Sequence, residues 1–201
     1  IADEVLGKEG KENREFLEET KYLPDSDLFD IEPGWSDEVS KTLFLDEERF
    51  KKAQELFNQY KLVGLNVPIE LTKKNGDKVT GHFKLFLKKD INKEHRQFIR
   101  NGISITLEPS RGSKINSPYR ALLLIGTDEL GSFCKSAETP NHTKFDESLE
   151  SISDHYRNGA VTIRQLRKAI NLFASFFIGI EDNLNRDRLA SILPVKLNGP
   201  N

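Results

Sequence analysis

Hydrophobic and polar residues alternate along the middle of the chain, a pattern that is typical of half-buried β-strands. One run of apolar residues occupies every second position from 65 to 71, and a matching run extends from 79 to 87. Asn75 and Gly76 lie between the two runs. Because Asn-Gly suits the left-handed turns of short hairpin loops, the pattern predicts an antiparallel hairpin with this dipeptide at its tip.

Two further apolar runs extend the predicted sheet. Alternation between 103 and 107 predicts a third strand, and the continuous apolar run at 119–126 predicts a central strand that is covered on both faces. Pro68 has no N–H to donate, so the first strand should lie at an edge of the sheet or carry a bulge there. We expect residues 65–126 to form one sheet.

Helical patterns precede this sheet. Residues 1–23 are mostly polar and predict a helix, and the connector after them contains Trp35 as its expected anchor. Asp46 is placed to cap a second helix, whose apolar residues from Phe50 to Tyr60 fall on one face.

After residue 127 apolar residues recur at steps of three and four, which is the period of an amphipathic helix. We expect one helix that is capped by Thr127 and broken at Pro140, then a second that carries Phe145 and ends at Gly159. The last helix is predicted to open with a capping box and to bury an apolar stripe. The capping box is Thr162 and Gln165, and the stripe includes Leu166, Ile170, Phe173 and Phe177.

Strands followed by helices favour an α+β fold, with helices packed on one face of a mainly antiparallel sheet. We expect this domain to occupy residues 45–201, after a helical arm and connector at 1–44. The chain has 201 residues, of which 36% are hydrophobic, so it can bury a sizeable core.

Composition narrows the classes of function. The 30 basic and 32 acidic residues give a net charge of −2, which provides no basic field for nucleic acid. The longest apolar run is too short to span a membrane, and the single Cys134 excludes an internal disulfide, so we expect a cytoplasmic protein. Met is absent even from position 1, which favours a piece of a longer protein.

The segment AETPNHTKF, at 137–145, concentrates chemistry between two predicted helices. Two or three of Glu138, His142, Cys134 and Asp146 could serve as metal ligands, but their irregular spacing is unlike that of zinc motifs. The plainer interpretation, which we favour, is a helix break at Pro140 with the imidazole of His142 bonded to a backbone carbonyl. We therefore expect no metal site.

A loop at 107–120, between the third and fourth predicted strands, contains Arg111, Lys114 and Arg120 among Ser, Gly and Asn residues. Backbone donors together with such cations can hold a phosphate, and Arg111 and Lys114 are the candidate phosphate sensors. The spacing of a Walker loop is absent, and a solvated connection is the competing interpretation. We expect residues 110–116 to be exposed.

Four segments in a fixed order resemble a known family. They read LFLDEERFKKAQELFNQYKLVGLNVPIEL, GHFKLFLKKD, FIRNGISI and ALLLIGTDELGSFCKSAETPNHTKF. The set resembles the second region of large bacterial ATP-binding proteins of the GHKL type, a class that includes MutL, gyrase B and the ninety-kilodalton heat-shock chaperone. The resemblance covers about residues 43–180. Its anchors are the turn Arg100, Asn101, Gly102 after a strand, and the motif positions Glu138, Pro140, His142, Thr143 and Phe145.

The resemblance implies a transducer-like domain similar to one half of a small-subunit ribosomal protein fold. The water, magnesium and adenine motifs of a GHKL domain are not found here, so we expect no catalytic residue and no cofactor in this chain, with ATP and Mg²⁺ bound in the parent protein. The implied partner is a missing N-terminal ATPase domain of the same chain, and a homo-oligomer is compatible. Such domains often lend a cation to the γ-phosphate, and Arg111 or Lys114 is the natural candidate, although neither matches a family motif.

The sequence thus predicts a non-catalytic transducer or regulatory domain of a GHKL-type ATPase. One alternative is a self-contained metal-dependent hydrolase built around Glu138, His142 and Asp146. Another is a nucleic-acid-binding module, which the interleaved acids of the basic segments argue against. Its cations would be Lys88, Lys89, Arg96, Arg100 and Arg111.

Overall fold

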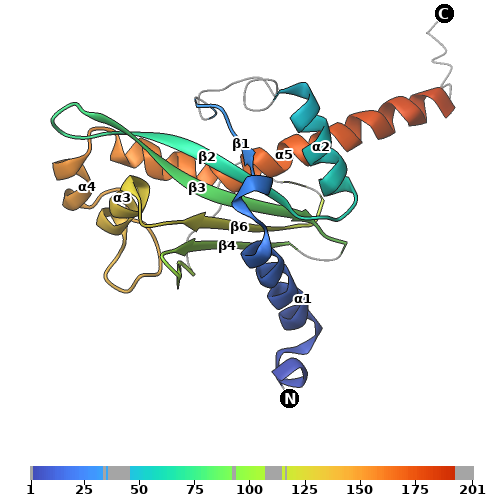
Figure 1. Ribbon diagram of the computed structural model, residues 1–201, viewed down its shortest axis with the longest axis horizontal. Helices are drawn as coiled ribbons and strands as arrows, with labels where there is room; N and C mark the ends of the chain where they lie inside the picture. Colours follow the sequence, from blue (N-terminus) through green and yellow to red (C-terminus); the bar gives the residue numbers. More distant parts are fainter. Residues whose placement is uncertain are drawn as a thin grey trace, which may run out of the picture.

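A computed structural model describes residues 2–33, 35, 46–91, 94–106, 115 and 117–192, with side chains described between residues 10 and 178 of these ranges. Its centre is a six-stranded sheet in the order β1-β2-β3-β6-β4-β5 (Figure 1). The elements are α1 (Ala2–Tyr22), a 3₁₀ turn (Asp25–Asp27), β1 (Phe29–Asp30), α2 (Glu47–Asn58), β2 (Val63–Thr72), β3 (Lys78–Lys89), β4 (His95–Arg100), β5 (Ile103–Ser104), β6 (Tyr119–Ile125), α3 (Glu129–Ala137), α4 (Glu150–His155) and α5 (Gly159–Ile192).

The sheet is mixed and mostly antiparallel. β2 pairs with β3, β3 with β6, and β4 with β5 in antiparallel fashion, whereas β1 with β2 and β4 with β6 run parallel. This confirms an α+β fold with one sheet across the described part of 65–126. Among the described residues, none of the helices has the length and apolar character needed to cross a membrane.

The predicted hairpin is confirmed. Leu71 of β2 faces Val79 of β3, and the turn between the strands contains Gly76 with φ of 103°. Asn75 accepts a hydrogen bond from the backbone N–H of Asp77 at 3.0 Å, which is the local bond that makes Asn a common turn residue. Gly76 is required here because residues with a Cβ rarely adopt a positive φ.

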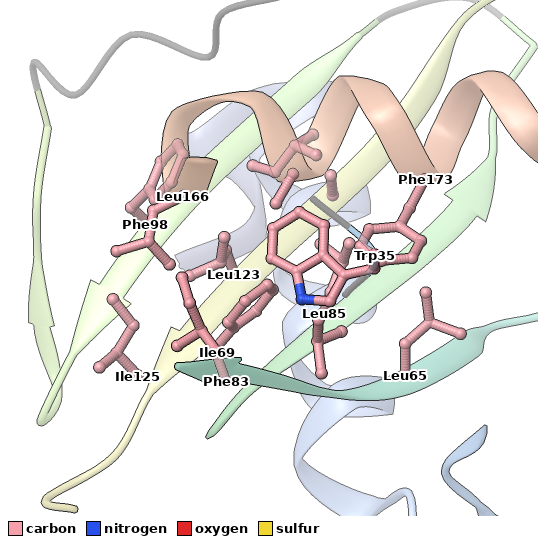
Figure 2. Packing of buried hydrophobic residues seen from close by; sticks show 14 of the residues in the cluster. Trp35, Leu65, Ile69, Phe83, Leu85, Phe98, Leu123, Ile125, Leu166 and Phe173 are labelled. Atoms are coloured by element: carbon pink, nitrogen blue, oxygen red, sulfur yellow. The ribbon is translucent and has the colours of Figure 1, made fainter. Parts of the chain in front are cut away.

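The main core lies between the sheet and helices α2, α3, α4 and α5. The predicted stripe on α5 is buried, and Figure 2 shows Leu166 and Phe173 of this helix over the strand side chains. Trp35 joins the same core at 4% exposure, with its ring centroid 5.4 Å from that of Phe173. Its Nε1 donates to the carbonyl of Pro68 at 2.5 Å, so the expected anchor role of Trp35 is confirmed.

The opposite face of the sheet is covered by α1, so helices pack on both faces and the expectation of a single covered face is corrected (Figure 1). Phe16 of α1 is 2% exposed and packs against Phe86 and Leu122. Lys88 of β3 holds the carboxylate of Glu19 at 2.6 Å. The predicted coverage of β6 on both faces is therefore confirmed.

Several boundaries differ from the predicted ones. α3 is capped by Asp128 rather than by Thr127. The carboxylate of Asp128 accepts a hydrogen bond from the N–H of Gly131 at 3.1 Å. The second helix shortens to α4, which leaves Phe145 outside it. Gly159 begins α5 instead of ending α4. A Cβ at this position would lie 1.9 Å from Ile152, so the close approach of Ile152 favours glycine here.

The prediction of a capping box at Thr162 is also wrong, since Thr162 lies inside α5. Its hydroxyl donates to the carbonyl of Asn158 at 3.3 Å. The cap of α2 is confirmed, because Asp46 accepts from the N–H of Arg49 at 2.8 Å.

Alternation alone missed β4, which carries polar residues at most positions. This strand nevertheless ends at Arg100, as the family resemblance implies. One of its polar side chains has an aromatic partner, since the guanidinium of Arg96 lies 5.3 Å from the ring of Tyr119. Of the predicted third strand, Ile103 and Ser104 form β5, and Leu107 lies outside the described residues.

Candidate functional site

The segment AETPNHTKF folds into a tight hairpin between α3 and α4. Glu138 and Phe145 face each other across an isolated antiparallel bridge. The N–H of His142 donates to the carbonyl of Thr139 at 2.8 Å, which closes a four-residue turn with Pro140 at its second position. Proline is favoured at this position because its ring fixes the φ angle that the turn needs.

His142 leaves this turn in the left-handed conformation, with φ of 56°. A left-handed residue after such a turn is a regular way to close a hairpin, although it is uncommon for a residue other than glycine. The imidazole Nδ1 lies 3.1 Å from Oε1 of Glu138. The side chain of His142 thus meets a carboxylate, and the expectation that it bonds a backbone carbonyl is wrong.

The other oxygen of Glu138 binds Arg100, which lies at the end of β4. Nε of Arg100 is 2.6 Å from Oε2 of Glu138, and Nη2 contacts the same oxygen. The two side chains are only 6% and 3% exposed, so this is a buried ion pair. After Arg100 the chain turns through Asn101 and Gly102, which have φ of 48° and 79°. The two segments that anchor the family resemblance therefore meet in space.

The far end of the hairpin is attached to α5. Phe145 is 1% exposed and belongs to the main core. Its carbonyl accepts a hydrogen bond from the buried guanidinium of Arg167 at 2.6 Å. Charge-assisted bonds of this kind are stronger than bonds between neutral groups. The hairpin is consequently fastened to β4 by Arg100 and to α5 by Arg167.

The imidazole of His142 has one feature of a general base, because a carboxylate orients one ring nitrogen and the side chain is 56% exposed. A nucleophile would have to lie within reach of the ring. The nearest hydroxyls along the chain, those of Thr139 and Thr143, instead donate to Oδ1 of Asn141 at 2.8 and 2.9 Å. These contacts stabilise the turn.

A metal site is not assembled from the predicted ligands. The carboxylate of Asp146 accepts from both the hydroxyl and the N–H of Ser148, and these bonds hold the pKa of Asp146 below its ordinary value. Cys134 is buried in the core. Within the described ranges, no three His, Cys, Asp or Glu side chains gather in an arrangement that could bind a metal ion.

The predicted phosphate sensors Arg111 and Lys114 lie outside the described residues. The third cation of that sequence segment, Arg120, lies at the start of β6. Its side chain is 6% exposed, and it binds Asp90 at 2.5 Å and Glu12 of α1 at 2.9 Å. Arg120 therefore ties α1 to the sheet.

Comparisons with protein-family models, with curated proteins and with solved structures found no match for this chain. Interpretation of the site therefore depends on the geometry of Arg100, Glu138 and His142 and on the resemblance of the motifs that contain them.

Proposed function

We propose that this chain is a non-catalytic, transducer-like domain of a GHKL-type ATPase, which couples ATP binding in a preceding domain to a downstream response. The observation that carries the proposal is the buried ion pair between Arg100 and Glu138. These residues lie 38 positions apart, in two of the four segments that resemble the family. The pair joins the end of β4 to the hairpin that follows α3.

A transducer must pass a displacement from one element to the next, and side-chain contacts connect three elements here. Arg100 fixes the end of β4 to the hairpin, and Arg167 fixes the hairpin to the long helix α5. Coupling between distant sites is carried by packed elements and by ion-pair networks of this kind. In this proposal, displacement of β4 is transmitted through the hairpin to α5.

The coarse architecture is compatible with the ribosomal-protein-like transducer fold, because four helices share one core on a single face of the sheet. ATP and Mg²⁺ belong, in this proposal, to an ATP-binding domain that precedes residue 1 in the parent protein. Cations of the transducer would reach the nucleotide only from exposed positions. Arg111 and Lys114 remain the proposed donors for that role.

The two alternatives receive less support from the side chains. The hydrolase needs Glu138, His142 and Asp146 to converge, whereas Asp146 bonds Ser148. The nucleic-acid module needs free cations, whereas Arg100 is buried against Glu138 and Lys88 is paired with Glu19.

The test compares ATP hydrolysis by the 201-residue chain with hydrolysis by the protein translated from its whole coding sequence. We expect turnover only in the longer protein. In that protein Glu138→Gln should reduce turnover while nucleotide affinity is retained, because the variant breaks the connection and not the nucleotide site. Glu47→Gln, which changes an exposed carboxylate on α2, is the matched control. Hydrolysis by the short chain alone, or unchanged turnover in Glu138→Gln, would contradict the proposal.

A further inference from the structure

One edge of β2 is only partly paired. The carbonyl of Pro68 accepts from Nε1 of Trp35 at 2.5 Å, and the carbonyl of Thr72 accepts from the N–H of Arg157 at 2.9 Å. Both carbonyls point away from β3. Because backbone polar groups alternate in direction along a strand, Glu70 must direct its N–H and its carbonyl toward the same edge.

Glu70 lies in the gap between these two covered stretches. On one side, β1 ends at Asp30, opposite Asn66 of β2. On the other side, Tyr156 forms a bridge with Lys73. Within the described part of the chain no residue bonds the outward backbone groups of Glu70. An unpaired N–H and carbonyl at a sheet edge form a template for an added strand.

A cavity of about 410 Å³ lies at this gap. Its lining includes Trp35, Ile69, Glu70, Val161, Thr162 and Gln165. Val161 is 44% exposed, which is high for an apolar residue of α5. The volume lies in the range of protein binding pockets, roughly 300–1,000 Å³. The gap thus combines backbone groups of Glu70 that no described residue bonds with a lining of both apolar and polar side chains.

We propose that this gap binds an extended peptide segment from a partner protein, which adds a short strand to β2 at Glu70. An extended peptide supplies an N–H and a carbonyl on the same side of one residue, as Glu70 does. The covered stretches at Pro68 and Thr72 limit the added strand to about three residues, or roughly 10 Å of extended chain. This proposal is independent of the proposed ATPase connection.

Charge selects the type of partner. The carboxylate of Glu70 is exposed and already binds Lys78 of β3 at 2.9 Å. A second copy of this chain paired symmetrically at Glu70 would place like charges opposite each other, which is destabilising. A partner with Lys or Arg opposite Glu70 would instead gain a favourable cross-strand pair. The residues on either side of that cation would point toward Trp35 and Val161, so they should be apolar.

The probe is the blocked peptide acetyl-Thr-Val-Lys-Val-Thr-amide. Trp35 is the only Trp in the chain and lines the cavity, so its fluorescence reports on binding. We expect a saturable change in Trp35 emission. We also expect slower hydrogen exchange at the N–H of Glu70 when the peptide is bound. Without peptide, that N–H should exchange faster than the N–H of Leu71, which faces β3.

Two controls distinguish strand addition from non-specific binding of the peptide. N-methylation of the peptide's Lys removes the N–H that would donate to Glu70, and it should weaken binding by roughly tenfold, the effect of one hydrogen bond. Glu70→Lys should prefer the peptide with Glu in place of Lys. Glu70 has an exposed side chain, so this variant should fold. Absence of binding, or equal binding of the methylated peptide, would overturn the proposal.

Discussion

The ion pair between Arg100 and Glu138 makes a quantitative prediction about stability. Both side chains are almost fully buried, at 6% and 3% exposure. Removal of one partner leaves the other charge buried without its ion-pair partner, which costs about 3–5 kcal/mol. Arg100→Met and Glu138→Leu should therefore each lower the free energy of unfolding by that amount. A domain of this size is stabilised by only about 5–15 kcal/mol in total, so either loss is large.

The double variant distinguishes an ion pair from two independent packing contacts. Replacement of both charges by apolar groups removes the buried charge altogether, and such exchanges are often close to neutral. We expect Arg100→Met with Glu138→Leu to be more stable than either single variant. His142→Ala is the internal control, because that imidazole is 56% exposed and its pairing with Glu138 should contribute no more than about 1 kcal/mol.

Urea unfolding followed by far-UV circular dichroism measures all four variants against the parent chain. The slope of free energy against urea should stay constant, so that midpoint shifts report stability. Strict additivity of the two single changes would refute the ion-pair reasoning. A loss below about 1 kcal/mol in Glu138→Leu would refute it as well, since the carboxylate would then contribute no more than an exposed group.

Two other sites give further predictions. Gly131→Ala should destabilise the chain strongly, because its Cβ would lie 2.0 Å from the carbonyl oxygen of Gly126, whereas Gly126→Ala has open space and should be tolerated; thermal unfolding compares the two. Burial raises the pKa of Tyr119 to about 12, so the unfolded chain loses this proton near pH 10 while the folded chain keeps it. The stabilising contribution is therefore complete below pH 10 and is lost as pH rises through 12. Absorbance at 295 nm should show a late ionisation that is missing in Tyr119→Phe.

The features that local patterns predicted correctly depend on contacts close in sequence. The hairpin around Gly76 follows from alternation and turn chemistry, and both are encoded within a few residues. The stripe on α5 follows from one helical period. Such patterns respond directly to backbone geometry, so they can be read without knowledge of the fold.

The features that were missed depend on tertiary contacts. β4 does not alternate in hydrophobicity, because it lies between β6 and β5 and some of its polar groups have partners there, such as Tyr119 for Arg96. Gly159 was predicted to end a helix, yet it begins one, and glycine is favoured there by the close approach of Ile152, a contact that the local pattern does not show. The placement of α1 was equally hidden, since Phe16 finds its partners on strands far along the chain.

The candidate site was predictable only in part. Glu138 and His142 are four residues apart, so the sequence alone showed an acid and an imidazole close together. Their connection to Arg100 was not, because it requires the sheet order that brings the end of β4 beside α3. The sequence favoured a plain helix break over a metal site, while the fold gives Glu138 a buried cation as its partner.

The two proposals assign different roles to the Arg100–Glu138 pair and to the edge of β2 at Glu70. Variants at the two sites should therefore change different measured properties. At Arg100 and Glu138 the polar groups bond each other within the chain, so substitutions there should alter stability first and coupling as a consequence. At Glu70 the side chain is exposed, so Glu70→Lys should change peptide choice with little effect on stability. The polar groups at Arg100 and Glu138 are already bonded within the chain, whereas the outward backbone groups of Glu70, which no described residue bonds, are available to an added strand.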